Sequence, residues 1–353
     1  MKNIFIVITF IIFTFLYSEY YIDTNFNYIK SSHDITGIAY DSTNKKLIVL
    51  IDDADFEFLN PEKEPIPSFD FCTLEIVNPE SGETITTKNI ATGPNSSNTE
   101  IGYLGGYDCD VDEKGNIYIN SYYGFGVEKL LYPLYNPQYA TTGGNDWFHN
   151  SAENNTIGIS VIKEDTFFLM LNNVKEENSN SSPEGIQGWQ NATTSTGKQS
   201  FLSLPNFENG LGLANDKNYL YVGNNFNNNP KILVIDINAY TLTNLYLELG
   251  TDFGIIADIE CDREGYVWVL SRNGILRKYK SYLQDEEKRL WKETHSFSPL
   301  ISITLPQHKY YYSLALSENA VFVAWSNGHD ALSGIIKYIQ EPQTFSNNYS
   351  HFK

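Results

Sequence analysis

Four acidic side chains occupy matching positions in two similar stretches of the sequence. Asp108 and Asp110 lie in GYDCDVDEKGNIYINS, and Asp258 and Glu260 lie in ADIECDREGYVWVLSR. Oxygen ligands of this kind suit a hard cation such as Ca²⁺, which binds about six to eight of them. Asn209, in a third similar stretch, would contribute an amide oxygen. The group predicts a calcium site, and no other cofactor is expected.

A second interpretation of these carboxylates stays open. Buried charges that lack a partner are costly, so the four groups need a cation, water or a basic partner. They can also lie solvated in a wet channel, or accept hydrogen bonds from neighbouring backbone amides. The sequence alone does not decide between a cation site and these alternatives.

The elements that must position these residues belong to a repeat. A short apolar strand, an acidic or glycine-containing turn and a second, aromatic strand recur near residues 36, 106, 157, 209, 257 and 312. Copies about 45 to 70 residues apart are typical of the four-stranded blades of a propeller. Gly115 and Gly265 fall where a tight turn needs a positive φ. The repeat predicts an all-β, six-bladed β-propeller, with YYIDTNFNYI (from Tyr20) supplying the missing outer strand and closing the ring.

Aligning the first strands compares two same-facing positions in each copy. Most copies hold small or apolar residues there, namely Gly37 and Ala39, Ile159 and Val161, and Leu211 and Leu213. Only the second and fifth copies hold acidic pairs. Blades two and five stand opposite each other in a six-fold ring, so the four carboxylates should approach the axis from both sides.

The ends of the second strands predict a ligand-binding mouth at one face of the ring. The residues just past these strands are Asp52, Tyr122, Asn172, Asn225, Arg272 and Ser326. His33 and Asp34 lie at the entrance to the first blade, where His33 is either a general base or an ordinary surface residue. Polar residues are common at strand ends, so the ring is either functional or merely solvated.

Two insertions interrupt the repeat. Residues 131–156 carry Tyr132, Tyr135, Tyr139, Trp147 and Phe148, which either pack on the propeller or form a recognition platform. Residues 173–198 are rich in Asn, Ser, Thr and Gly, and we interpret them as a flexible loop in the third blade.

Composition and charge narrow the choice of partners. The chain has 25 Tyr, 21 Phe and 5 Trp, and aromatic residues favour β-strands. Its net charge is −19. Such a field repels polyanions, so nucleic acid and anionic membrane surfaces are excluded, while cations, neutral glycans and peptides remain. The acidity can also serve solubility alone.

The first 18 residues have the layout of a secretory signal peptide. Lys2 precedes an apolar run from Ile4 to Leu16, and Ser18 stands at the cleavage point. We therefore expect residues 19–353 to form a single extracytoplasmic domain, secreted or periplasmic, with no transmembrane segment. We further expect a monomer. Three dispersed cysteines, Cys72, Cys109 and Cys261, are too few to form a disulfide framework.

The repeat phrases resemble those of NHL-type six-bladed propellers over most of residues 33 to 340. Asn209-Gly210-Leu211, followed by Tyr219-Leu220-Tyr221-Val222, also resembles the Asn-bearing strand of the gluconolactonase/regucalcin family. That resemblance implies a divalent cation held on the axis by Glu, Asn and Asp, and the opening of lactones. Asn209 matches, but Thr36 stands in the place of the Glu. Ala257 stands in the place of the Asp, with Asp258 next to it.

The motifs of common enzymes are missing from the sequence. It contains no G-x-S-x-G, H-E-x-x-H, P-loop or paired C-x-x-C. We therefore expect an exported propeller that binds a ligand, protein, peptide or glycan through its axial mouth and the aromatic insertion. The alternative is a calcium-dependent hydrolase of lactones or phosphoesters built on Asp108, Asn209 and Asp258.

Overall fold

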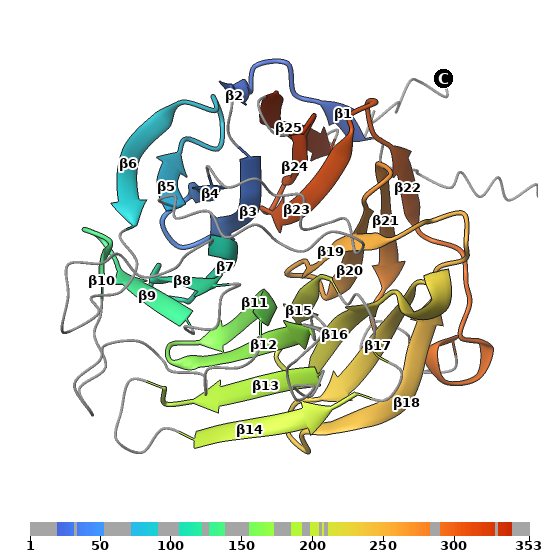
Figure 1. Cartoon of the computed structure of the whole chain (residues 1–353). Helices are drawn as coiled ribbons and strands as arrows, with labels where there is room; N and C mark the ends of the chain where they lie inside the picture. Colours follow the sequence, from blue (N-terminus) through green and yellow to red (C-terminus); the bar gives the residue numbers. More distant parts are fainter. Residues whose placement is uncertain are drawn as a thin grey trace, which may run out of the picture.

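Six antiparallel sheets stand around a common axis (Figure 1). The computed structural model describes residues 20–31, 34–52, 72–90, 106–121, 127–137, 155–172, 185–192, 198–204, 207, 211–282, 290–328 and 331–340. Five sheets have four strands, and the sixth has four blade positions with its outer strand in two pieces. The prediction of an all-β propeller with six four-stranded blades is confirmed.

Each blade is numbered by its place along the chain. Blade 1 contains β3 (Asp34–Asp41), β4 (Lys46–Asp52), β5 (Cys72–Val77) and β6 (Thr84–Ile90). Blade 2 contains β7 (Gly106–Val111), β8 (Ile117–Ser121), β9 (Val127–Leu131) and β10 (Asn136–Pro137). Blade 3 contains β11 (Asn155–Lys163), β12 (Thr166–Asn172), β13 (Gly185–Gln190) and β14 (Lys198–Ser203).

The second half of the ring repeats this order. Blade 4 contains β15 (Leu213–Asn215), β16 (Tyr219–Asn224), β17 (Lys231–Asp236) and β18 (Thr241–Glu248). Blade 5 contains β19 (Ile256–Cys261), β20 (Tyr266–Ser271), β21 (Ile275–Lys280) and β22 (Ile301–Thr304). Blade 6 contains β23 (Tyr310–Leu316), β24 (Ala320–Ser326) and β25 (Leu332–Gln340). Two short helical turns, η2 (Phe226–Asn228) and η3 (Leu290–Thr294), complete the described elements.

The N-terminal strand closes the ring, as predicted from the sequence. β1 (Tyr20–Ile22) and β2 (Tyr28–Ser31) both pair antiparallel with β25, which places Tyr20 opposite Gln340. A buried ammonium fixes this seam, because Lys337 Nζ lies 3.0 Å from Asp23 Oδ2 and 2.7 Å from Glu80 Oε2. Blade 6 therefore joins chain segments from both ends of the described sequence, and it leaves no open edge at the seam.

The core lies between neighbouring blades rather than inside any one of them. Cys109 of blade 2 packs with Ala39 and Ile48 of blade 1, and Phe322 of blade 6 packs with Ile38 of blade 1. Each sheet thus buries its faces against the next sheet, which is why a blade cannot be stable alone.

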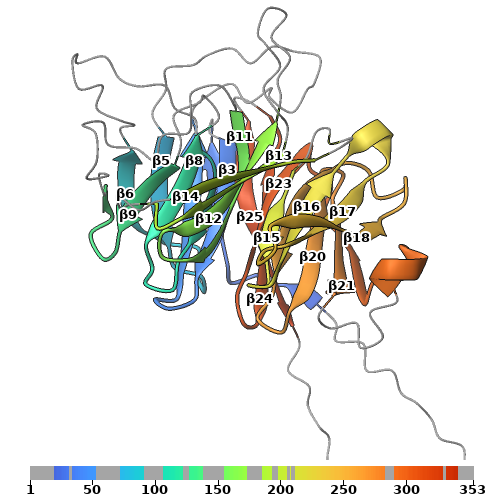
Figure 2. The same ribbon diagram turned by 90° about the horizontal axis from the view of Figure 1, so that it is seen from below.

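The two faces of the ring differ in their connections. Inner strands begin at one face, here called the entry face, and the turns from first to second strands lie at the opposite turn face (Figure 2). Asp52 at the end of β4 and Cys72 at the start of β5 lie at the entry face. The turn face has tight turns, where Gly115 has a φ of 85° and Gly265 a φ of 81°.

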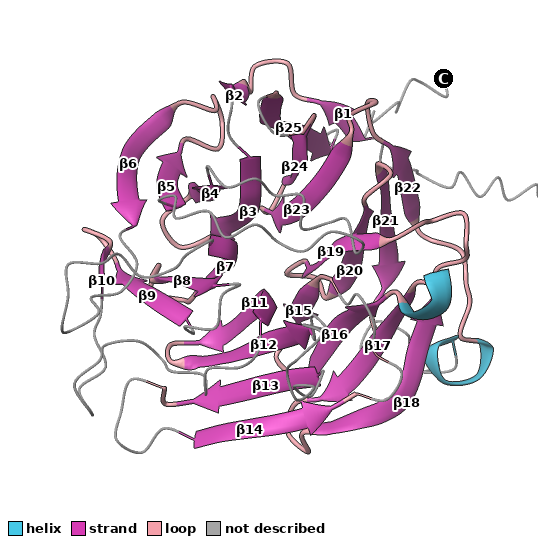
Figure 3. Cartoon of the chain, viewed as in Figure 1, coloured by secondary structure: helices cyan, strands magenta, loops and turns pink. Residues whose placement is uncertain are grey.

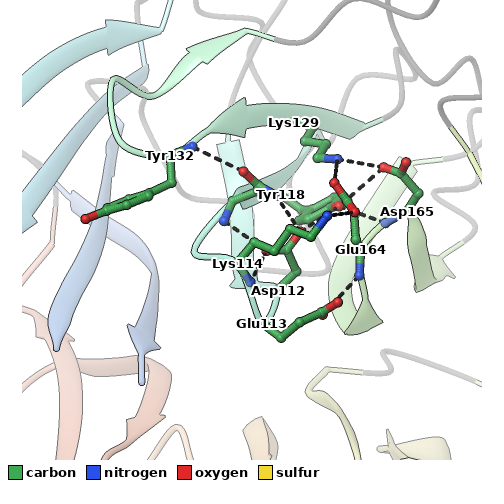
Figure 4. Close-up of polar contacts among 9 residues, drawn as sticks. Asp112, Glu113, Lys114, Tyr118, Lys129, Tyr132, Glu164 and Asp165 are labelled. Atoms are coloured by element: carbon green, nitrogen blue, oxygen red, sulfur yellow. Dashed lines mark hydrogen bonds and ion pairs between the residues drawn. The ribbon is translucent and has the colours of Figure 1, made fainter. Parts of the chain in front are cut away.

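Aspartates organise these tight turns and link blades at the turn face (Figure 4). Asp112 Oδ1 accepts hydrogen bonds from the Lys114 and Asn116 amides, and Asp112 Oδ2 accepts one from the Tyr118 hydroxyl. Buried Lys129 reaches from β9 to Asp165 of blade 3, with 2.8 Å between Nζ and Oδ1. The carboxylate of Asp112 accepts hydrogen bonds from residues of its own turn, so its role is structural.

The interpretation of residues 173–198 as a loop is wrong for residues 185–190. These residues form β13, which pairs with both β12 and β14 and buries Ile186 and Gln187. Their Gly and Gln content hid a strand whose side chains are enclosed by neighbouring strands. The first insertion likewise contains β10 and the start of β11 at Asn155.

Candidate functional site: the axial carboxylates

The inner strands β3, β7, β11, β15, β19 and β23 contact one another in a closed ring around the axis. In each inner strand, two same-facing residues point toward the next blade. These pairs are Gly37 and Ala39, Asp108 and Asp110, Gly158 and Ser160, Gly212 and Ala214, Asp258 and Glu260, and Ser313 and Ala315. Four blades therefore hold small residues where blades 2 and 5 hold acids.

The sequence alignment was wrong by one residue in blades 3 and 4. Ile159 and Val161 pack on blade 2, and Leu211 and Leu213 pack on blade 3. Because side chains alternate between the two faces of a strand, a slip of one position exchanges one face for the other. Register shifts near the start of five inner strands make this slip hard to see in the sequence.

Small residues make room for the acidic strands. A Cβ added to Gly37 would lie 2.9 Å from Asp108 Cα, and one added to Gly212 would lie 2.8 Å from Asp258 Cα. The glycine of one blade thus lets the inner strand of the next approach closely. The same arrangement recurs on both sides of the axis, so blades 1–2–3 repeat as blades 4–5–6.

Each aspartate ties its own strand to the next blade. Asp108 accepts hydrogen bonds from its neighbour's amide, Cys109 N at 2.9 Å, and from Ile159 N of blade 3 at 3.2 Å. Asp110 repeats the pattern two residues further along, with Val111 N at 2.7 Å and Val161 N at 2.6 Å. These carboxyl groups satisfy amides that would otherwise face the axis without a partner.

Asp258 makes the equivalent link from blade 5 to blade 6. It accepts hydrogen bonds from Ile259 N at 2.8 Å and from Leu314 N at 2.7 Å, and from the Ser313 hydroxyl at 3.2 Å. Ser313 Oγ in turn accepts the Ile38 amide of blade 1 at 3.1 Å. For Glu260, the described residues give one stabilising hydrogen bond, from the Cys261 amide. Glu260 is therefore the carboxyl group least committed to the framework.

Burial and mutual repulsion raise the pKa of all four carboxyl groups. Burial raises the pKa of Asp110 to about 6 and of Asp258 to about 7. It holds the pKa of Asp108 and of Glu260 well above their usual range, and the charge of Asp258 adds to both effects. The charges of the blade 5 acids affect the pKa of the blade 2 acids, and the charges of the blade 2 acids affect the pKa of the blade 5 acids. The two pairs therefore face each other across the axis. At neutral pH the group is therefore partly protonated.

The described carboxyl groups do not fit a metal ion well. Within the described ranges, no three His, Cys, Asp or Glu side chains form a group that could hold one. All four carboxyl groups accept hydrogen bonds from backbone amides, which was one of the alternatives to a cation site. Asn209 lies outside the described residues, Ala257 is buried, and Thr36 cannot supply a carboxylate. We therefore derive no chemistry through calcium.

The structure gives structural roles to some residues predicted at the mouth. Asn225 is buried and binds both the amide and the carbonyl of Ile256, at 2.9 and 3.4 Å. Ser326 is buried and donates a hydrogen bond to Asp34. Arg272 is half-buried, and its amide donates to the Ile255 carbonyl at 3.0 Å. Asp52 and Asn172 end β4 and β12, whereas His33 and Tyr122 lie outside the described residues.

The described part of the aromatic insertion lies at the turn face, away from the entry face. Tyr132 packs edge-on against Tyr135 and beside Gly115, and Tyr135 is buried between blades 1 and 2. Tyr139, Trp147 and Phe148 lie outside the described residues. Tyr132 and Tyr135 therefore cannot share one surface with the residues at the entry face.

The sequence reasoning missed one buried polar residue beside the acids. Asn120 of β8 is fully buried, and its Oδ1 accepts the Asp108 amide at 2.8 Å. It sits directly opposite Asp108 in the register. An alignment of the second strands would have shown the signal, because the corresponding residues of other blades are apolar. Of the cysteines, Cys109 is buried and Cys261 half-buried, and both are free thiols.

The fold and the axial residues define a six-bladed β-propeller, and structural comparison agrees. The chain is similar to the gluconolactonase XC5397 of Xanthomonas campestris (10% identity, TM-score 0.53, covering 89% of each chain). It is similar to the calcium-binding protein regucalcin of Agrobacterium tumefaciens (12%, 0.53, covering 88% of this chain and 93% of the other). A third similar structure is the PQQ-bound aldose sugar dehydrogenase of Streptomyces coelicolor (12%, 0.55, 92% and 98%). At these identities the likeness concerns the fold alone.

The sequence itself gives no closer match. No protein-family model and no curated protein sequence matches the chain. Among the described residues, no helix is long and apolar enough to cross a membrane.

Proposed function

We propose that this protein is a binding module that takes the cationic group of a ligand, an ammonium or a guanidinium, into its axial channel. The observation that carries the proposal is the two acidic pairs that face each other across the axis: burial raises the pKa of all four carboxyl groups, and repulsion across the axis adds to it for Asp108, Asp258 and Glu260. A cation between them would remove this repulsion and allow the groups to ionise. The strongly negative net charge of −19 would also draw cations toward the ring.

Surface accessibility supports an open channel. Asp258 is buried, but Asp108, Asp110 and Glu260 each keep part of their surface exposed. We include in the proposal that residues 1–18 direct export and that the ligand is met outside the cytoplasm.

A hydrolase remains the alternative, because gluconolactonases are among the structural neighbours. The residues here favour binding over it. Asn209 matches one cation ligand of that family, but Thr36 and Ala257 stand at the other two positions, and the aspartates bind backbone amides instead. The absence of a familiar catalytic motif in the sequence points the same way.

Binding of a simple amine tests the proposal. Ethylammonium chloride, titrated calorimetrically at pH 7 in two buffers of different ionisation enthalpy, should bind with release of protons, since it favours ionised carboxylates. Glu260→Gln should weaken this binding and reduce the proton release, whereas Glu83→Gln, an exposed matched control, should change neither. Potassium chloride at equal ionic strength controls for screening. No binding, or binding that is unchanged in Glu260→Gln, would refute the proposal.

A further inference from the structure

An unsatisfied amide donor lies beside the axial acids. Asn120 is fully buried, and its Nδ2 has no hydrogen-bond partner among the described residues. The orientation of the amide is fixed, because its other end must be the oxygen that accepts the Asp108 N–H at 2.8 Å. The free end is therefore a donor, held next to Asp108.

The fold does not require a polar residue at this position. The register places Leu50 opposite Gly37, Met170 opposite Gly158 and Leu270 opposite Asp258, and all three are fully buried. A buried donor without an acceptor costs about 1–3 kcal/mol. Other blades fill this position with apolar side chains. Asn120 therefore lowers the stability of the fold unless an acceptor binds its Nδ2 group.

Asp108 lies directly beside this donor. Both of its oxygens accept backbone amides, from Cys109 and Ile159. Burial and the charge of Asp258 hold the pKa of Asp108 well above the usual range. The Asn120 donor therefore lies on the blade 2 side, and acidic groups of blade 5 lie across the axis.

We propose that the Asn120 amide, beside Asp108, forms a subsite for an acceptor oxygen of the ligand. Building on the proposed function, the axial channel would then select ammonium ions that carry a neighbouring hydroxyl or carbonyl oxygen. The ammonium group lies near Asp110, Asp258 and Glu260. The oxygen accepts a hydrogen bond from Asn120 Nδ2. Amino alcohols and amino sugars have this chemistry, and simple alkylamines lack the oxygen.

Ethanolamine and ethylammonium, compared on the whole protein, test the subsite. Ethanolamine should bind roughly 3- to 10-fold more tightly to the wild type, as one neutral hydrogen bond allows. Asn120→Leu, which copies the residue of blades 1 and 5, should remove most of this preference. The preference is the ratio of the two affinities on the same variant, and cooperative thermal unfolding shows that the variant is folded.

The outcomes separate the two proposals. If neither amine binds the wild type, the proposed function fails. If both bind equally, a fixed water satisfies Asn120 and the subsite does not exist. If the preference for ethanolamine persists in Asn120→Leu, another group selects the oxygen and the assignment is wrong. The comparison on wild-type protein decides the question even if Asn120→Leu does not fold.

Discussion

The raised pKa values of the axial carboxyl groups predict that the protein loses stability as the pH rises. In the folded state the pKa of Asp110 is about 6 and that of Asp258 about 7, against an ordinary value of 3.8. Between these values the folded chain holds protons that the unfolded chain has released. Stability from this source is fully present below the ordinary pKa and disappears as the pH passes through 6 and 7.

The magnitude follows from the number of pKa units that are crossed. Each unit corresponds to about 1.4 kcal/mol, so a change from pH 5 to pH 8 removes about 3 kcal/mol through Asp258 and about 1 kcal/mol through Asp110. The total, on the order of 4 kcal/mol, is a large part of the stability of an ordinary domain. His308 has the opposite effect on stability, which it increases as the pH rises, because burial lowers its pKa in the folded state.

Urea unfolding at several pH values, in the absence of amines, measures this effect. Glu260→Gln should flatten the pH dependence and stabilise the protein at pH 8, since it removes a carboxyl group whose ionisation is opposed by burial and by the charges of Asp108, Asp110 and Asp258. Comparing the variant with wild type cancels the contribution of His308, and Glu83→Gln serves as the exposed control. Stability that is constant or rises between pH 6.5 and pH 8 would refute the reasoning about the axial site.

Three further perturbations test the framework that holds the site. Gly37→Ala places a Cβ 2.9 Å from Asp108 Cα, so it should reduce the free energy of unfolding by about 1–3 kcal/mol in urea, and an unchanged midpoint would contradict the close approach of blades 1 and 2. Lys337→Met leaves buried Asp23 without its ammonium partner, whereas Glu80 is 82% exposed and stays solvated, so the change should cost about 1–3 kcal/mol and speed proteolysis of residues 20–31; equal rates would show that the ion pairs do not secure the seam. Calcium at millimolar concentration should leave the melting temperature unchanged, whereas a site filled 100-fold above its Kd would add about 2.7 kcal/mol, and such a shift, if lost in Asp258→Asn, would favour the hydrolase.

The sequence predicted the fold because the blade is a local unit. Strand, turn and strand recur in each copy, and Gly115 and Gly265 mark turns that need a positive φ. The opposed acidic pairs could also be predicted, because blades 2 and 5 follow from counting the copies. The sixth copy is followed by too few strands to complete a blade, which predicted that the segment from Tyr20 supplies the outer strand and closes the ring.

The details of the site depend on contacts between blades, which no local pattern contains. The alignment predicted Ile159 at the position that faces blade 4. Because of a register shift near the start of β11, Gly158 occupies that position instead. One amide partner of Asp108, Ile159, lies 51 residues away in the chain. Asn120 is informative only once the register with Asp108 is known.

The seam in blade 6 also determines how the molecule responds to force. β1 and β25 run antiparallel, with Tyr20 opposite Gln340, so the two ends of the described chain leave from the same end of the pairing. A load that pulls these ends apart breaks the backbone pairs one after another, as in a zipper, instead of shearing them all at once. A tether through both termini would therefore open the ring at low force, and it would begin at the strand that completes it.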